Sequence, residues 1–88
     1  MQIETIKVAL VEDHTEFRLS LCEYINNNKQ YECVSYPNSQ SILAHIKETQ
    51  TSPKIILMDI NMPGKDGIEC TQIIKNKYPD TLVMMCTN

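Results

Sequence analysis

Four segments rich in β-branched and apolar residues alternate with three segments of helical period, and this alternation constrains the fold more than any other feature. The expected strands are Thr5–Val11, Tyr31–Tyr36, Lys54–Ile60 and Thr81–Thr87. The expected helices occupy the three segments between them, and Pro79 ends the last one. Strand–helix–strand repetition with short connections predicts an α/β fold with a parallel sheet and right-handed crossovers.

Each expected helix carries apolar residues at helical spacing, so that one face can cover the sheet. Asn38 or Ser39 is expected to cap the second helix. The apolar positions, in chain order, are Phe17, Leu21, Tyr24 and Ile25 in the first helix, Ile42, Leu43 and Ile46 in the second, and Ile68, Ile73 and Ile74 in the third.

Length and composition are those of one small domain spanning residues 1–88. Isoleucine, leucine, valine and phenylalanine make up a quarter of the chain and the net charge is only −3, which excludes intrinsic disorder. The acidic balance and the lack of a Lys/Arg run argue against direct binding of nucleic acid or an anionic membrane. No apolar stretch is long enough to span a bilayer and no signal peptide is recognisable, so a cytoplasmic location is expected.

The four cysteines, Cys22, Cys33, Cys70 and Cys86, match neither a redox pair nor a zinc-ligand grouping by their spacing. We expect four reduced thiols that serve as small apolar side chains.

Polar side chains with catalytic potential follow three of the expected strands. Glu12 and Asp13 follow the first strand, Asp59 comes near the end of the third, and Thr87 closes the fourth. The carboxyl ends of parallel strands share one edge of a sheet, and this edge is where such sheets bind ligands. The sequence therefore predicts that these side chains meet at one edge.

Three converging carboxylates repel one another, and a hard divalent cation such as Mg²⁺ relieves the repulsion. Asp59 could then stay ionised, attack phosphorus and form an aspartyl phosphate, while the Thr87 hydroxyl could donate to a phosphoryl oxygen. The alternative is that Glu12 and Asp13 only solvate a loop, with Asp13 or Thr15 capping the following helix.

Three motifs occur in an order and with a spacing that resemble the receiver domain of bacterial two-component response regulators. They are VALVEDH (Val8–His14), ILMDINMPGKDG (Ile56–Gly67) and LVMMCT (Leu82–Thr87). The resemblance implies a flavodoxin-like, doubly wound parallel sheet. His14 directly after the acidic pair is similar to receivers of LuxR-type regulators, which implies a transcription regulator as the parent protein.

The resemblance also implies a role for each matching residue. Asp59 matches the phosphoacceptor, which takes its phosphoryl group from a sensor histidine kinase. Asp13 matches a direct Mg²⁺ ligand, Glu12 a ligand acting through water, and Asn61 the position whose backbone carbonyl completes the protein ligands. Thr87 matches the switch hydroxyl. The residues that match the loop-shaping positions are Met62, Pro63, Gly64 and Gly67.

The chain departs from the family by stopping where the fourth strand ends, so we expect a truncated receiver of four strands and three helices. The family continues with a helix, a strand bearing a lysine that pairs with the phosphoryl group, and a final helix. In this chain the fourth strand would become an edge with apolar faces. We expect dimerisation or domain swapping along it.

Two other functions compete with the phosphoryl-accepting switch, which is not an enzyme in the usual sense. One is a truncated, non-signalling dimerisation fragment with impaired phosphorylation. The other is a phosphohydrolase with an aspartyl nucleophile. Such enzymes usually carry a second Asp two residues after the first, and Asn61 stands there in this chain.

Overall fold

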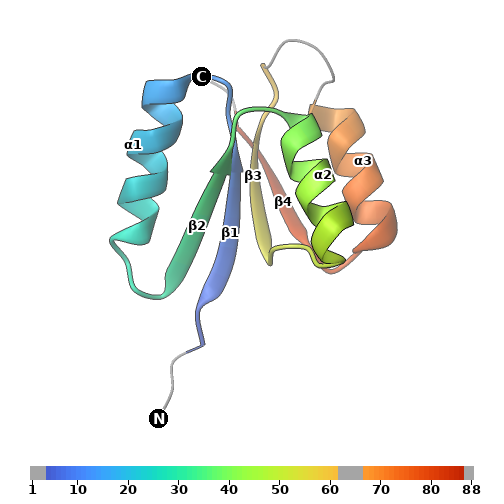
Figure 1. Cartoon of the computed structure of the whole chain (residues 1–88), viewed down its shortest axis with the longest axis horizontal. Coiled ribbons are helices and arrows are strands. Elements are labelled where there is room, and N and C mark those ends of the chain that lie inside the picture. Colours follow the sequence, from blue (N-terminus) through green and yellow to red (C-terminus); the bar gives the residue numbers. More distant parts are fainter. Residues whose placement is uncertain (1–3, 62–66, 87–88) are drawn as a thin grey trace.

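The computed structural model describes residues 4–61 and 67–86, in which four strands alternate with three helices. The strands are β1 (Ile6–Val11), β2 (Tyr31–Tyr36), β3 (Ile55–Asp59) and β4 (Leu82–Cys86). The helices are α1 (Thr15–Asn26), α2 (Ser39–Thr49) and α3 (Gly67–Lys77). Figure 1 shows α1 on one face of the sheet and α2 and α3 on the other. The predicted alternation of strands and helices is confirmed.

The four strands form one parallel sheet in the order β2-β1-β3-β4. Val11 of β1 lies opposite Met58 of β3, and Asp59 at the end of β3 lies opposite Cys86 of β4. This register brings the carboxyl ends of three neighbouring strands to the same edge of the sheet. The predicted doubly wound α/β architecture is confirmed, with four strands and three helices in the described part of the chain.

The face of the sheet that α2 and α3 cover holds the larger core. Each of its eight residues is at most 6% exposed, so this face is closed to water. Two helices lying next to each other bury the inner strands completely on this side, and burial of this kind is the main source of stability in a small domain. The core residues are Ala9, Val11, Ile56 and Met58 from the strands, Ile42 and Ile46 from α2, and Cys70 and Ile74 from α3.

The opposite face is covered by α1 alone, and its core is smaller. Val8, Leu10 and Cys33 are buried beneath the helix. Ile55 and Leu57 of β3 are only partly buried, because α1 packs against β1 and β2 rather than over β3 and β4. Only half of this face is therefore closed.

The narrow contact of α1 corrects part of its predicted apolar stripe. Leu21 and Ile25 face the sheet as expected, but Phe17 is 45% exposed and Tyr24 is 76% exposed. Cys22 takes the contact with β2 instead, which turns Phe17 and Tyr24 away from it.

In α3 the structure likewise differs from the predicted apolar positions. Ile74 is buried, whereas Ile68 and Ile73 are exposed, and Cys70 occupies the inward position one turn before Ile74. In α2 all three apolar residues contact the core as predicted, and Asn38 is the cap, its side chain accepting the Ser41 N–H.

Within residues 4–61 and 67–86, no helix has the length and apolar character needed to cross a membrane.

On the face of the sheet that α1 covers, an apolar groove of about 650 Å³ runs between this helix and the part of the sheet that the helix leaves uncovered. Tyr24 and Ile25 form its wall on α1, and Leu57 and Met84 form its floor on β3 and β4. Its position explains why these side chains remain partly in solvent although the sheet continues beneath them.

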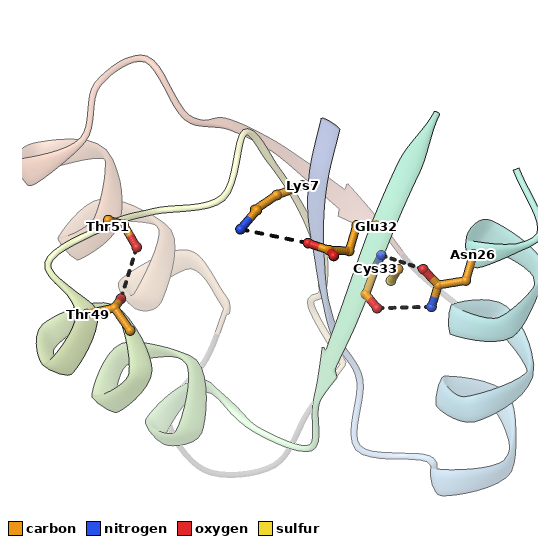
Figure 2. Close-up of polar contacts among 6 residues, drawn as sticks. All are labelled: Lys7, Asn26, Glu32, Cys33, Thr49 and Thr51. Carbon is orange, nitrogen blue, oxygen red and sulfur yellow. Dashed lines mark hydrogen bonds and ion pairs between the residues drawn. The ribbon is translucent and has the colours of Figure 1, made fainter. Parts of the chain in front are cut away.

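At Cys33, the backbone groups on the outer edge of β2 are bonded by side chains of α1. The Asn26 amide oxygen accepts the Cys33 N–H at 2.7 Å, and its amide nitrogen donates to the Cys33 carbonyl at 3.0 Å (Figure 2). The Cys22 thiol also donates to this carbonyl, at 3.3 Å. At Cys33 the amide thus takes the place of a neighbouring strand, and backbone groups that are already bonded there resist pairing with another chain.

Candidate acidic phosphoacceptor site

Glu12, Asp13 and Asp59 converge at the carboxyl edge of the sheet. One carboxylate oxygen of each lies within 4.8 Å of the others. Glu12 directly follows β1 and Asp59 ends β3, so the pairing of these two strands brings the two groups together. Glu12 is 2% exposed and Asp59 4% exposed, whereas Asp13 is open to solvent.

The loop after β1 is held by backbone and side-chain hydrogen bonds. The Glu12 N–H donates to the Tyr36 carbonyl of β2 at 3.0 Å, and the Glu12 carboxylate accepts the His14 N–H at 2.9 Å. Arg18 of α1 donates from its guanidinium Nη1 to the Glu12 carbonyl at 3.1 Å. The acidic pair therefore sits on a fixed turn that is tied to both β2 and α1.

His14, rather than Asp13 or Thr15, caps α1. Its Nδ1 accepts the Phe17 N–H at 3.2 Å, and its backbone is extended as an N-cap requires. The interpretation that the acidic pair serves the loop and the helix cap is therefore wrong for the cap. Because His14 performs this task, the Asp13 carboxylate stays available at the edge of the sheet.

Asp59 is fixed by the chain that leaves β3. Its Oδ1 accepts the Asn61 N–H at 2.9 Å, and the intervening Ile60 N–H donates to the Cys86 carbonyl of β4 at 3.1 Å. A carboxylate this deeply buried is costly unless hydrogen bonds or a cation offset its desolvation. Oδ2 is the oxygen of Asp59 that does not bond to Asn61.

Gly67, which was predicted to shape the loop, is the first residue of α3 and is buried. A Cβ at this position would lie 2.7 Å from Cγ of Met58 and 3.2 Å from the Asp59 carbonyl. Glycine thus permits the close approach of α3 to the end of β3, and a larger residue would make Met58 or the Asp59 backbone shift.

Sequence reasoning missed two residues at this edge, Arg18 and Cys86. Partial desolvation, followed by the nearby charges of Asp59 and Glu12, raises the pKa of the Cys86 thiol. All four cysteines are free, as expected, and Cys33 and Cys70 are buried among apolar side chains, whereas Cys86 is exposed and does not serve as a core residue. Arg18 could have been suspected because it is the only arginine in the chain and lies one turn into the helix after the acidic pair.

The remaining predicted residues lie outside the described part of the chain. These are Thr87, the predicted switch hydroxyl, and Met62, Pro63 and Gly64 of the predicted loop.

The donor set at this edge fits a hard divalent cation. Three carboxylates offer only oxygen ligands, and one cation placed among them would offset charges that otherwise repel. Two of the three are buried, where the cation's charge would be weakly screened. The fold and this site define a doubly wound α/β domain with an acidic, cation-suited pocket at the carboxyl edge of its sheet.

Comparison with known proteins identifies the family. A family model described as response regulator receiver domain matches residues 8–88. The chain is 34% identical over 84 residues to the response regulator protein VraR of Staphylococcus aureus, covering 96% of this chain and 40% of that protein. The chain therefore belongs to the response regulator receiver domain family. It spans about 40% of the length of these curated relatives.

Solved structures agree with this assignment. A LuxR-family two-component response regulator from Aurantimonas sp. SI85-9A1 superposes with a TM-score of 0.81 at 27% identity, covering 96% of this chain and 59% of that one. Response regulator protein TrrA of Thermotoga maritima, solved in complex with Mg²⁺-BeF, superposes with a TM-score of 0.79 at 25% identity, covering 94% and 70%. The predicted flavodoxin-like receiver fold is confirmed.

Proposed function

We propose that this chain accepts a phosphoryl group on Asp59 from the phosphohistidine of a sensor histidine kinase, in a reaction that depends on Mg²⁺. The modification would switch the output of the parent protein, which we propose to be transcription in the cytoplasm. The observation that carries the proposal is the convergence of Glu12, Asp13 and Asp59 within 4.8 Å at the carboxyl edge of the sheet.

The chemistry asks for a fixed, ionised carboxylate. An oxygen of Asp59 attacks phosphorus, the bond from phosphorus to the kinase imidazole breaks, and its electron pair returns to the imidazole nitrogen. The product is an acyl phosphate on Asp59. The hydrogen bond from the Asn61 N–H to Oδ1 supports this role, since it fixes the orientation of the carboxylate.

The ligands we propose for Mg²⁺ are the Asp13 and Asp59 carboxylates, Glu12 through water, and the backbone carbonyl of Asn61. The bound ion supplies positive charge that offsets the charge on the transferring phosphoryl group. Asn61 is exposed and carries no titratable proton, so it cannot act as the general acid of an aspartyl-nucleophile phosphohydrolase. This favours a switch over an enzyme that turns over substrate.

The phosphorylation test measures intact mass after incubation with a small acyl-phosphate donor, with and without Mg²⁺. We expect a gain of one phosphoryl group only with Mg²⁺, lost in Asp59→Asn and retained in Asp80→Asn. Asp80 is the matched control because it precedes β4, at the opposite edge of the sheet. No gain in the native chain, or an equal gain in Asp59→Asn, would contradict the proposal.

We further propose that a second copy of the chain associates along β4, by strand pairing or domain swapping. Leu82, Met84 and Met85 are 53%, 50% and 43% exposed there, and Met84 continues into the apolar groove. The β2 edge is bonded to Asn26, which supports β4 as the edge that pairs.

Light scattering during size-exclusion chromatography tests the association. We expect a dimer for the native chain, a monomer for Met84→Lys, and a dimer for the control Val34→Lys, which adds the same charge on β2. A compact monomer of the native chain at micromolar concentration would contradict it. A dimer that gains no phosphoryl group would instead favour the non-signalling dimerisation fragment.

A further inference from the structure

We propose that Arg18 is a positioning residue for the acidic site: it fixes the peptide that joins Glu12 to Asp13 and thereby sets the affinity for the divalent cation. This inference rests on the proposed function, because it assumes that the three carboxylates bind the cation. Arg18 itself need not touch the ion or the phosphoryl donor.

The contact is directed at the backbone and not at a carboxylate. Arg18 Nη1 donates to the Glu12 carbonyl at 3.1 Å, and this carbonyl belongs to the peptide bond between the two acidic residues. Rotation of that peptide would move the two carboxylates relative to each other. A planar guanidinium loses little freedom per hydrogen bond formed, which suits it to holding one orientation.

The arginine is itself well anchored. The backbone N–H of Arg18 donates to the His14 carbonyl at 2.9 Å in the first turn of α1, and the His14 side chain caps that helix. The guanidinium therefore extends from the first turn of α1 back to the loop, and the same loop caps this helix through His14. Strand β2 holds the other side of Glu12 through the Tyr36 carbonyl. The backbone of Glu12 is thus held on its N–H side by β2 and on its carbonyl side by α1.

The effect of removing Arg18 on the affinity for Mg²⁺ depends on which of its properties matters, its positive charge or its contact with the backbone. A cation close to three carboxylates repels Mg²⁺, so loss of its charge alone would strengthen metal binding. Loss of a group that orients metal ligands typically weakens metal binding by about 10–100-fold. The sign of the change therefore separates a positioning residue from a nearby charge.

The experiment is a calorimetric titration of the unphosphorylated chain with MgCl₂, at a temperature where circular dichroism finds every variant folded. We expect binding to weaken about tenfold or more in Arg18→Met. Arg18→Lys should recover part of this loss, because an ammonium can still donate to the carbonyl. The matched control is Lys7→Met, which removes the same charge from an exposed ion pair with Glu32 and should leave the affinity within about twofold.

Equal or tighter binding in Arg18→Met would overturn the inference, as would a loss of equal size in Lys7→Met. If Arg18→Met does not fold, Arg18→Ala, which also lacks a side-chain donor, replaces it under the same criteria. A native chain that binds no Mg²⁺ would contradict the proposed function instead, so the two failures are distinguishable.

Discussion

The two faces of the sheet differ in how completely they are covered. The face under α2 and α3 is closed, and every residue of its core is at most 6% exposed. The face under α1 is closed only over β1 and β2, and a groove of about 650 Å³ lies beside the helix over β3 and β4. The closed face holds β3 and α3 together behind Asp59, while the open face leaves apolar side chains of β3 and β4 partly exposed to solvent. The closed side of these strands therefore contributes more to stability than the open side.

The largest expected effect comes from truncating neighbouring residues of β3 that face opposite sides. Ile56 is 0% exposed in the closed core, so Ile56→Ala should lower the free energy of unfolding by about 2–5 kcal/mol. Leu57 borders the groove, and Leu57→Ala should lower it by about 1 kcal/mol, since part of its surface is already in water. Urea denaturation followed by circular dichroism measures both. Equal losses would contradict the difference between the faces.

A pH titration examines the core beneath α1. Burial first, and then the hydrogen bond and charge of Cys22, raise the pKa of Cys33 from 9.0 to about 12. Above pH 9 the thiol ionises in the unfolded chain but stays protonated in the folded one. The contribution of this thiol to stability is therefore fully present below pH 9 and is lost as the pH rises toward 12. Denaturation midpoints across this range should fall less steeply in Cys33→Ala. An unchanged slope would show that the thiol does not titrate differently in the folded chain.

Removing the Asn26 side chain should open the edge of β2. Two hydrogen bonds to Cys33 are lost, and at about 1 kcal/mol each, Asn26→Ala should destabilise the fold by about 2 kcal/mol. The exposed edge should also increase association, which light scattering detects. Asn27→Ala is the control, because it changes the adjacent exposed asparagine. Similar behaviour of the two variants would argue that the amide does not protect the edge.

Enlarging one side chain on each face compares how tightly the two faces are packed. In Gly67→Ala the new Cβ meets Met58 and the Asp59 backbone, and overpacking of about 1–3 kcal/mol should exceed the helix-propensity gain of about 1 kcal/mol. A net loss of about 1 kcal/mol is expected. Leu57→Phe, which grows into the groove, should be neutral by the same denaturation measurement. A stabilised Gly67→Ala would mean that the closed face has room.

The smallest effect is expected for the exposed ion pair of Lys7 and Glu32 (Figure 2). Lys7 Nζ and Glu32 Oε2 are 3.8 Å apart and both side chains are more than half exposed, so Glu32→Gln should change stability by less than about 0.5 kcal/mol. The change should vanish in high salt. A larger effect in thermal denaturation would show that this corner of the sheet is more ordered than its exposure suggests.

The sequence was sufficient to predict the order of elements and the meeting of the acidic residues. Strand β3 reads as continuously apolar because both of its faces are at least partly covered, and its last residue, Asp59, reaches the carboxyl edge of the sheet. Parallel pairing then requires Glu12 and Asp59 to be neighbours, whatever the side-chain details.

The details that depend on tertiary contact were not predictable. Helical periodicity placed Phe17 and Tyr24 with Leu21, but the helix turns toward β2 because Cys22 and Asn26 bond to Cys33. Likewise, an N-cap can be any of several polar residues near a helix start, and only the folded loop selects His14. The reach of Arg18 back to the loop depends on a rotamer, which the sequence does not encode locally.

The central claim, that Asp59 is the phosphoryl acceptor, is tested most directly by trapping the product. An acyl phosphate on an aspartate is reduced by borohydride to homoserine, which peptide mass spectrometry can locate in the chain. After treatment with an acyl-phosphate donor and Mg²⁺, homoserine should appear at position 59 and be absent when Mg²⁺ is removed. Homoserine at position 13 or at another aspartate, with Asp59 intact, would contradict the account.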